Sequence, residues 1–224
     1  AEKLSLSITQ EFPKHQFAWK VLGIALKQMG KLNESLVATH KSVQLDPKDA
    51  EAHKNLGVLL NEQNRLEEAE VSYRQAIKLK PNYPEVHNNL GVILKKLGKL
   101  DQAETNYRKA ITLKPDYAKA YSNLSILLDE QGKLKEAVAS CRKAIELKPD
   151  LSYIHNNLGV MLQKYRKSNE ACSAYIQAIN LNPDFTDAYE NLGIVIKNLS
   201  FNSSNVELYP VLIRLLTNGN FARP

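Results

Sequence analysis

Hydrophobic residues recur at three- and four-residue intervals along most of the chain, which is the spacing of one face of an α-helix. Between residues 84 and 117 the pattern occurs twice, first as Val86, Leu90, Ile93, Leu94 and Leu97, then as Leu100, Ala103, Tyr107, Ala110 and Ile111. Gly98 separates the two runs and Pro115 follows the second. Glycine accepts the left-handed conformation that ends a helix, and proline lacks the N–H that would continue one. The pattern therefore predicts a hairpin of two helices.

This hairpin is one copy of a repeat. Pro47, Pro81, Pro115, Pro149 and Pro183 are evenly spaced along the chain, and Pro13 falls on the same grid. Self-similarity at such a period is typical of an all-α solenoid, in which hairpins stack on one another. We expect the second helix of a truncated unit over residues 1–15, five full units over 16–185, an incomplete sixth unit over 186–200, and a loop with a C-terminal capping helix over 201–224. Because the chain opens within a unit and without Met, we expect a fragment of a longer protein.

Small residues mark the contact between the two helices of a unit. Gly91 lies in the middle of a first helix and is predicted to face Ala103 of the second, which would let the two helices approach closely. Unit four departs from this pattern, with Ser125 at the glycine position and Cys141 at the tyrosine position. Unit five has Arg166 where the turn glycine is expected. A left-handed conformation costs a non-glycine residue ~1 kcal/mol or more, so we expect a weaker turn there.

The repeat has the signature of a known family. Trp19, Leu22 and Gly23 in the first unit, and Ala103, Tyr107, Ala110 and Pro115 in the third, occupy its characteristic positions. Over residues 16–193 the chain resembles the tetratricopeptide repeat proteins. The resemblance implies a right-handed superhelical solenoid whose first helices line a concave groove for peptides or other proteins. We therefore expect a protein-interaction scaffold with a protein or peptide ligand.

One stripe of side chains on the first helices is the best candidate for contact with a partner. Residues at offsets of four, three and four lie on one helix face. The stripe contains Asn55, Asn89, Asn123, Asn157 and Asn191, one per unit, followed in four units by Val58, Val92, Ile126 and Val160, and it also includes Lys96, Lys119 and Tyr153. An asparagine amide offers two donors and one acceptor, which complement a peptide backbone. The stripe is therefore predicted to hold an extended chain.

This row of asparagines is similar to the one in the superhelix of the protein O-linked N-acetylglucosamine transferases. The resemblance implies that the row holds an acceptor protein for a separate catalytic domain. The alternative is that the asparagines bond only within the array and bridge neighbouring first helices, because asparagine inside a helix is otherwise unfavourable. The two roles are compatible.

The sequence predicts neither a catalytic centre nor a metal or cofactor site. His53, His87 and His155 share one repeat position, but residues a whole hairpin apart cannot share a zinc ion with bonds of ~2 Å, so we expect packing residues. Cys141 and Cys172 lack CxxC spacing and are expected in the core. Motifs typical of nucleotide-binding loops, zinc proteases and serine hydrolases do not occur. We expect this segment not to be an enzyme.

Charge gives weaker guidance. The 30 basic and 24 acidic residues leave a net charge of +6. A basic stripe on the predicted outer face contains Arg74, Arg108, Lys109, Arg142 and Lys143. Stacking aromatics do not alternate with it, so a solvated face is favoured over nucleic-acid binding. No apolar run is long enough for a membrane span, and we expect a cytoplasmic protein. Self-association through the repeat ends or the groove is an alternative function, motivated by the apolar residues 206–216.

Overall fold

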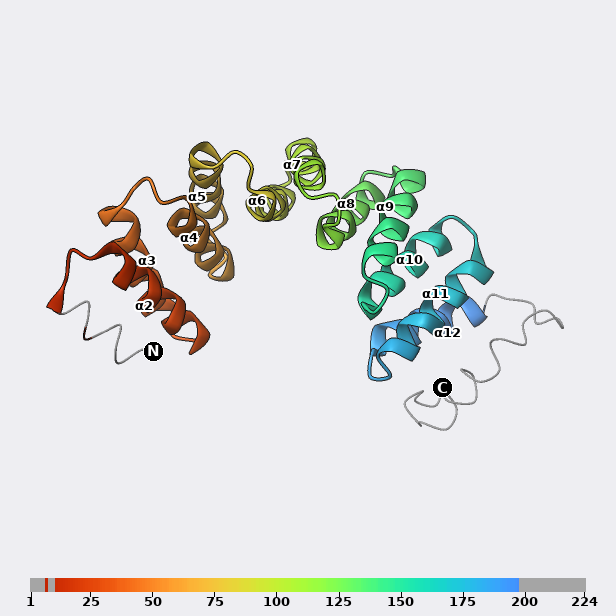
Figure 1. Cartoon of the computed structure of the whole chain (residues 1–224). Coiled ribbons are helices and arrows are strands. Elements are labelled where there is room, and N and C mark those ends of the chain that lie inside the picture. Colours follow the sequence, from red (N-terminus) through yellow and green to blue (C-terminus); the bar gives the residue numbers. More distant parts are fainter. Residues whose placement is uncertain (1–6, 8–10, 198–224) are drawn as a thin grey trace. The chain divides into compact units, whose positions relative to one another are not determined.

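The computed structural model describes residue 7 and residues 11–197, and this part of the chain folds as a series of helical hairpins (Figure 1). The first helices of successive hairpins are α2 (Gln16–Gln28), α4 (Ala50–Glu62), α6 (Pro84–Lys96), α8 (Ala118–Glu130), α10 (Ser152–Lys164) and α12 (Thr186–Lys197). The second helices are α3 (Leu32–Leu45), α5 (Leu66–Leu79), α7 (Leu100–Leu113), α9 (Leu134–Leu147) and α11 (Ser168–Leu181). Both series begin at one constant interval, so the fold is the all-α repeat solenoid that the sequence predicts.

Two of the predicted segments fall outside this range. Most of the helix expected over residues 1–15, and all of the capping helix expected over 201–224, lie outside the described residues.

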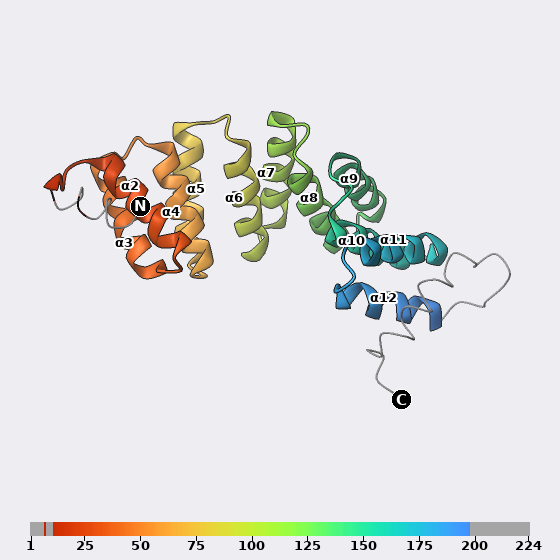
Figure 2. The ribbon, with the colours of Figure 1, turned by 60° about the horizontal axis from the view of Figure 1, so that its bottom comes forward.

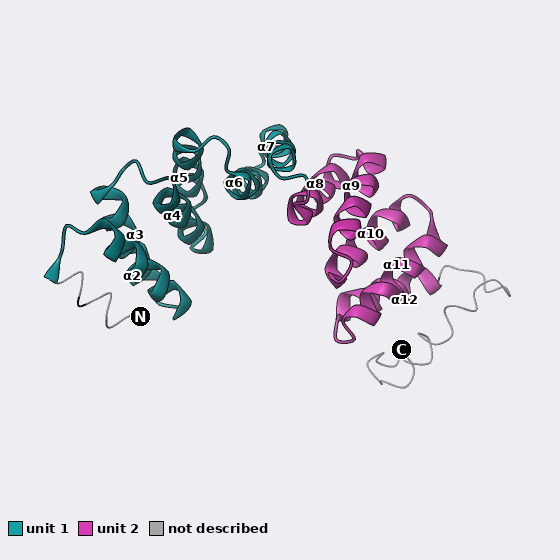
Figure 3. Cartoon of the chain, in the orientation of Figure 1, with its two compact units in different colours: residues 1–115 teal, residues 116–224 magenta. Residues whose placement is uncertain are grey.

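The chain divides into two compact units, residues 1–115 and residues 116–224 (Figure 3). In the first unit the hairpins stack in sequence, with α3 packed on α4 and α5 packed on α6. Figure 2 shows α4 to α7 lying side by side. In the second unit α9 packs on α10, and α11 packs on α12 in the same way. First helices such as α4 and α10 are therefore covered by second helices on both sides, which leaves one face for other contacts.

In three hairpins a glycine and a tyrosine ring set the distance between the two helices, and in the first hairpin Gly23 faces Thr39 in place of a ring. Tyr73, Tyr107 and Tyr175 are almost fully buried. A Cβ atom on Gly57 would lie 2.7 Å from the Tyr73 ring, and one on Gly91 would lie 2.6 Å from the Tyr107 ring. Carbon atoms in contact prefer about 3.5–4.0 Å, so the ring fits only because glycine has no side chain.

The same contact adds a neighbour that was not predicted for these glycines. The atoms nearest to a Cβ on Gly91 belong to the ring of Tyr107, a residue that the sequence pattern did not pair with this glycine. Ala103 is fully buried in the same hairpin. In the first hairpin the residue at the alanine position is Ser35, and its hydroxyl donates to the carbonyl oxygen of Gly23 at 2.6 Å.

The fourth hairpin shows how the interface changes when glycine is absent. Ser125 and Cys141 occupy the glycine and tyrosine positions there, and both are fully buried. The Ser125 hydroxyl donates to the carbonyl oxygen of Ser122 at 2.8 Å, and the Cys141 thiol donates to that of Ile154 at 3.4 Å. Cysteine is much smaller than tyrosine and leaves room for the serine side chain. The two departures therefore form one compensating exchange.

Each turn inside a hairpin contains one residue in the left-handed conformation. These residues are Gly30, Asn64, Gly98, Gly132 and Arg166, with φ of 75°, 57°, 74°, 74° and 56°. The left-handed position predicted for Arg166 is thus confirmed. After it, the N–H of Lys167 donates to the carbonyl oxygen of Leu162 at 2.9 Å, which closes the end of α10 as at the glycine turns.

Repeated histidines bind three first helices, α4, α6 and α10, to the end of the helix before each of them. His53, His87 and His155 are buried. Their Nε2 atoms lie 3.0, 3.0 and 2.9 Å from the carbonyl oxygens of Pro47, Pro81 and Pro149. Proline ends the second helix and leaves its own carbonyl group outside the helical pattern. The histidine supplies that carbonyl with a partner, so these residues serve packing.

A double-mutant cycle tests the compensating exchange. Gly91→Ser places a side chain against the Tyr107 ring and is expected to destabilise the protein by about 1–3 kcal/mol through overpacking. Tyr107→Cys leaves a cavity and is expected to cost about 2–4 kcal/mol. The double variant recreates the pair found at Ser125 and Cys141, so its loss in unfolding free energy should be smaller than the sum by about 1 kcal/mol or more.

Urea-induced unfolding followed by circular dichroism measures all four corners of this cycle. If the loss in the double variant equals the sum of the two single losses to within about 0.5 kcal/mol, the two positions act independently.

Candidate functional site

The predicted stripe lies on the face of the first helices that the second helices leave open. We call it the asparagine stripe, and it consists of Asn55, Val58, Asn89 and Val92 in the first compact unit and of Asn123, Ile126, Asn157, Val160 and Asn191 in the second. Every one of these side chains is half-buried. Their neighbours in sequence, such as Leu56 and Leu90, are buried in the core. The stripe is therefore neither core nor fully solvated surface.

Asn89 and Asn191 of the stripe make hydrogen bonds within the array. Asn191 Nδ2 donates to Asn156 Oδ1 of the preceding first helix at 3.1 Å. Asn89 Oδ1 accepts from Asn88 Nδ2 at 3.4 Å, and Asn89 also bonds to the hydroxyl of Tyr73. Burial raises the pKa of Tyr73, and the bond to Asn89 offsets part of that rise. The bridging role that the sequence left open is thus present at Asn191, and Asn89 is held by Asn88 of its own helix and by Tyr73 of the preceding hairpin.

Asn55 lines a cavity in the first compact unit. The cavity has a volume of about 370 Å³ and is lined by Gly23, Ile24, Lys27 and Gln28 of α2, by Thr39 of α3, and by Glu51, Lys54, Asn55, Val58 and Leu59 of α4. Asn55 Nδ2 is buried and has no hydrogen-bond partner among the residues that the structure describes. A buried donor without an acceptor costs about 1–3 kcal/mol, which an acceptor from outside the chain would recover.

The α2 residues of this cavity were not predicted from the sequence. Ile24 stands one repeat before Val58 and so holds the same repeat position. Val21 takes the asparagine position of that unit, which is why the stripe was expected to begin at Asn55. The repeat spacing alone would have placed Ile24 on the same helix face as Val58. Lys27 and Gln28 enter only because α2 ends beside α4.

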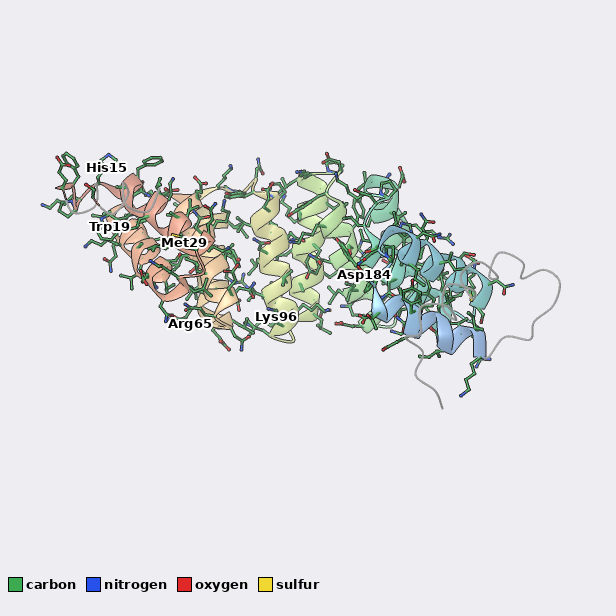
Figure 4. The ribbon with its side chains drawn as sticks, turned by 90° about the horizontal axis from the view of Figure 1, so that it is seen from below. His15, Trp19, Met29, Arg65, Lys96 and Asp184 are labelled. Atoms are coloured by element: carbon green, nitrogen blue, oxygen red, sulfur yellow. The ribbon has the colours of Figure 1, made fainter. Side chains whose placement is uncertain are left out.

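The charged and aromatic members of the predicted stripe are exposed, but two of them already have partners. Lys96 Nζ donates to Asn61 Oδ1 of the preceding first helix at 2.9 Å. Figure 4 shows Lys96 at the end of α6, beside the α4–α5 hairpin. Tyr153 is 41% exposed and bonds to the Ser122 side chain, while Lys119 is exposed at the start of α8. Lys96 therefore stabilises the stack, which leaves Lys119 and Tyr153 as candidate contacts.

An ion pair holds α2 to the start of α4, next to the cavity. Asp49 accepts from the backbone N–H groups of Glu51 and Ala52 at 2.8 and 3.1 Å and so caps α4. It also accepts from Lys20 Nζ at 2.9 Å and from Gln16 Nε2 at 2.8 Å, both on α2. Burial raises the pKa of Asp49, but the hydrogen bonds outweigh it and hold this pKa below its usual value.

Four of the five residues of the basic stripe, all except Lys109, donate to carboxylates. Arg74 Nε donates to Glu70 at 2.9 Å and Arg108 Nε donates to Glu104 at 2.9 Å. Arg142 Nη2 donates to Glu170 at 2.8 Å and Lys143 Nζ donates to Glu146 at 2.7 Å. A phosphate backbone would have to compete with these carboxylates. The pairing favours the solvated outer face over a nucleic-acid surface.

The cysteines lie in the core of the second compact unit. Cys141 and Cys172 are free thiols, and both are buried. Burial raises the pKa of Cys141 to about 12 and that of Cys172 to about 11, so neither thiol ionises near neutral pH. In the described part of the chain, no group of three His, Cys, Asp or Glu side chains is arranged to hold a metal ion. None of the helices in that part is long and apolar enough to cross a membrane.

Comparison with known proteins assigns this architecture to a class and a family. Stacked hairpins of constant length with a glycine–tyrosine contact define the chain as a tetratricopeptide repeat protein. The chain belongs to the family of the cilia and flagella-associated protein 70 C-terminal domain, whose model matches residues 1–157. A comparison with curated proteins gave no match.

Several solved structures have the same fold. The tetratricopeptide repeat protein YrrB is 21% identical, with a TM-score of 0.69 over 89% of this chain and 100% of its own. MamA from Desulfovibrio magneticus is 19% identical, with a TM-score of 0.69 over 76% of this chain and 96% of its own. PilF from Pseudomonas aeruginosa is 22% identical, with a TM-score of 0.67 over 80% of this chain and 88% of its own. At this level of identity the likeness establishes the fold.

The Asp49–Lys20 contact predicts how stability varies with pH. Because the pKa of Asp49 is lowered by folding, its charge stabilises the protein above the usual aspartate pKa near 4, and that stabilisation is lost as the pH falls through the folded value. Asp49→Asn keeps a residue able to cap α4 but removes the charge, and it should cost about 0.5–1 kcal/mol at neutral pH.

Unfolding free energies of both proteins between about pH 7 and pH 2.5 test this prediction. The difference should stay constant down to about pH 4 and disappear below it. The exposed Asp150→Asn serves as the control and should change little at any pH. A difference that persists at the lowest pH would mean that the charge of Asp49 contributes nothing.

Proposed function

We propose that the chain is a protein-binding scaffold that holds an extended segment of a partner protein along the asparagine stripe. One observation carries the proposal. A half-buried asparagine followed by a half-buried valine or isoleucine recurs at one repeat position, on the side of the first helices that the hairpin packing leaves open. A surface needed only for folding would not have to keep an accessible amide at each of these positions.

The chemistry of the stripe suits a peptide backbone. Each asparagine amide can donate to a carbonyl oxygen and accept from an N–H group, so it recognises the backbone whatever the side chains are. Each valine or isoleucine adds apolar area beside it. An extended chain rises about 3.3 Å per residue, and successive first helices are at least one helix spacing of about 8–10 Å apart, so each first helix would serve roughly three residues of the partner or more.

The internal hydrogen bonds of the stripe support this role instead of opposing it. Asn191 uses one N–H of its amide on Asn156, and Asn89 is held by Asn88 and Tyr73. An amide has two donors and an acceptor with two lone pairs, so each keeps capacity for a further bond. A side chain already fixed in position also loses less conformational entropy when a ligand binds.

The comparisons suggest where such a partner would be found. The family takes its name from a cilia and flagella-associated protein, so we propose that the partner is another protein of these organelles. YrrB, which shares the fold, is described as having an unusual peptide-binding site. The role of the stripe here does not depend on that site, because this proposal is drawn from the residues of this chain.

Removing two amides tests the proposal. A fluorescent peptide selected from a display library against the whole chain provides the probe. Asn89→Ala combined with Asn157→Ala should weaken its binding about tenfold or more, because each lost hydrogen bond contributes about 0.5–1.5 kcal/mol. Fluorescence anisotropy gives the dissociation constants.

Matched substitutions on the other side of the array provide the control. Asn169 and Asn180 are exposed on the second helix α11, and Asn169→Ala with Asn180→Ala should leave the affinity unchanged. Tyr73→Phe removes the bond to Asn89 but keeps the amide, and it should also preserve binding. Equal affinity of the stripe variant and the parent would rule out the asparagine stripe as the binding surface.

A further inference from the structure

The cavity between α2, α3 and α4 adjoins the asparagine stripe and combines open space with a donor that has no partner among the described residues. We propose that it receives an aliphatic side chain of the bound segment together with a neighbouring acidic residue. This inference rests on the proposed function and specifies one end of the binding surface. It also names the chemistry of the segment that binds there.

The apolar part of the cavity fits an aliphatic side chain. Ile24, Val58 and Leu59 line it, and Gly23 contributes backbone without a side chain. Ile24 is 40% exposed, although most large apolar residues of this compact unit are buried. The volume of the cavity, about 370 Å³, lies within the usual range of ligand pockets. Filling it with a leucine, isoleucine or valine side chain would remove apolar surface from water.

The polar part of the cavity presents donors. Asn55 Nδ2 is buried without a partner among the described residues. A backbone carbonyl group of an extended segment is the acceptor that this N–H lacks, and the Asn55 amide has to turn toward the cavity to meet it, because Nδ2 is covered in the free protein. By contrast, the Nδ2 atom of Asn191 donates to Asn156 inside the array. The free donor therefore distinguishes Asn55 from Asn191.

The charged residues that line the cavity are Lys27, Lys54 and Glu51, so the lining is positive by one charge and favours an acid. Lys54 Nζ is 3.8 Å from the nearest carboxylate oxygen of Glu51, too far for a hydrogen bond. Glu51 is held on its other side by Lys20, at 3.2 Å. Lys27 is paired with Glu62 at 2.8 Å. Lys54 Nζ also lies 5.8 Å from the centroid of the Tyr83 ring, a contact that uses none of its N–H groups as hydrogen bonds to oxygen. A carboxylate on the bound segment would form with Lys54 the short contact that Glu51 does not.

Defined peptide pools test this specificity. Nine-residue peptides, acetylated and amidated so that they carry no terminal charges, contain leucine with glutamate, leucine with lysine, or serine with glutamate, with one to three residues between the two. The leucine–glutamate pool should bind the whole chain about tenfold more tightly than either of the others, since it alone supplies both the apolar and the charged contact.

Three variants assign the preference to the cavity. Lys54→Gln should reduce the preference for glutamate over lysine about fivefold or more, Asn55→Ala should weaken the leucine–glutamate pool about fivefold, and Ile24→Trp should block the apolar space. Lys78→Gln removes the same charge from an exposed position on α5 and should change nothing. Circular dichroism unfolding confirms that each variant keeps the fold.

The outcomes separate this inference from the function on which it rests. If Lys54→Gln, Asn55→Ala and Ile24→Trp bind all pools as the parent does, while Asn89→Ala with Asn157→Ala weakens the display-selected peptide, the cavity is not the site and the stripe still is. If the parent binds no pool and the display library yields no peptide, both proposals are wrong.

Discussion

The contact between a glycine of the first helix and a tyrosine ring of the second is the constraint on which the rest of this structure depends. It brings the two helices together at Gly57, Gly91 and Gly159. Once the glycine face is turned toward the ring, the residues two positions before it must point away from the hairpin. Those residues are the asparagines of the stripe, so the packing of the hairpin decides what a partner can reach.

The fourth hairpin shows that the constraint is one of combined volume. Ser125 and Cys141 replace glycine and tyrosine together, and the interface stays fully buried. The asparagine of that hairpin, Asn123, remains half-buried like the others. The surface therefore depends on the distance between the helices and not on one particular pair of residues.

Much of the fold follows from the sequence because the repeat fixes helix positions and faces. The even spacing of the prolines predicts a hairpin in every repeat, and the helices begin at the same interval. The left-handed position of Arg166 follows from the turn glycines at the same place in other units. Such features are local in the chain, so the period alone determines them.

Contacts between hairpins were harder to predict, because they depend on side-chain reach. Lys96 appears as a stripe residue in the sequence, yet it bonds to Asn61 of the preceding first helix. The cavity forms because α2 lies beside α4. Asn55 Nδ2 has no hydrogen-bond partner among the described residues, and this depends on the positions of all neighbouring acceptors, which the sequence does not give. Repeat position gives the direction of a side chain but does not give the neighbour it meets.

The distribution of charge illustrates the same limit. A net charge of +6 and a row of arginines suggest a positive outer surface. In the structure Arg74, Arg108 and Arg142 each donate to a carboxylate, so much of that charge is neutralised locally. Near the cavity, by contrast, Lys54 keeps unused capacity. Pairing, and not the total number of charges, indicates where a ligand would find an attractive site.

The most direct measurement of the central claim is the nuclear magnetic resonance of the asparagine side-chain amides during titration with the display-selected peptide. If the stripe binds an extended backbone, the signals of Asn55, Asn89 and Asn157 shift as the peptide is added, and those of Asn169 and Asn180 on α11 do not. Shifts confined to Asn169 and Asn180, with the stripe signals unmoved, would contradict the account.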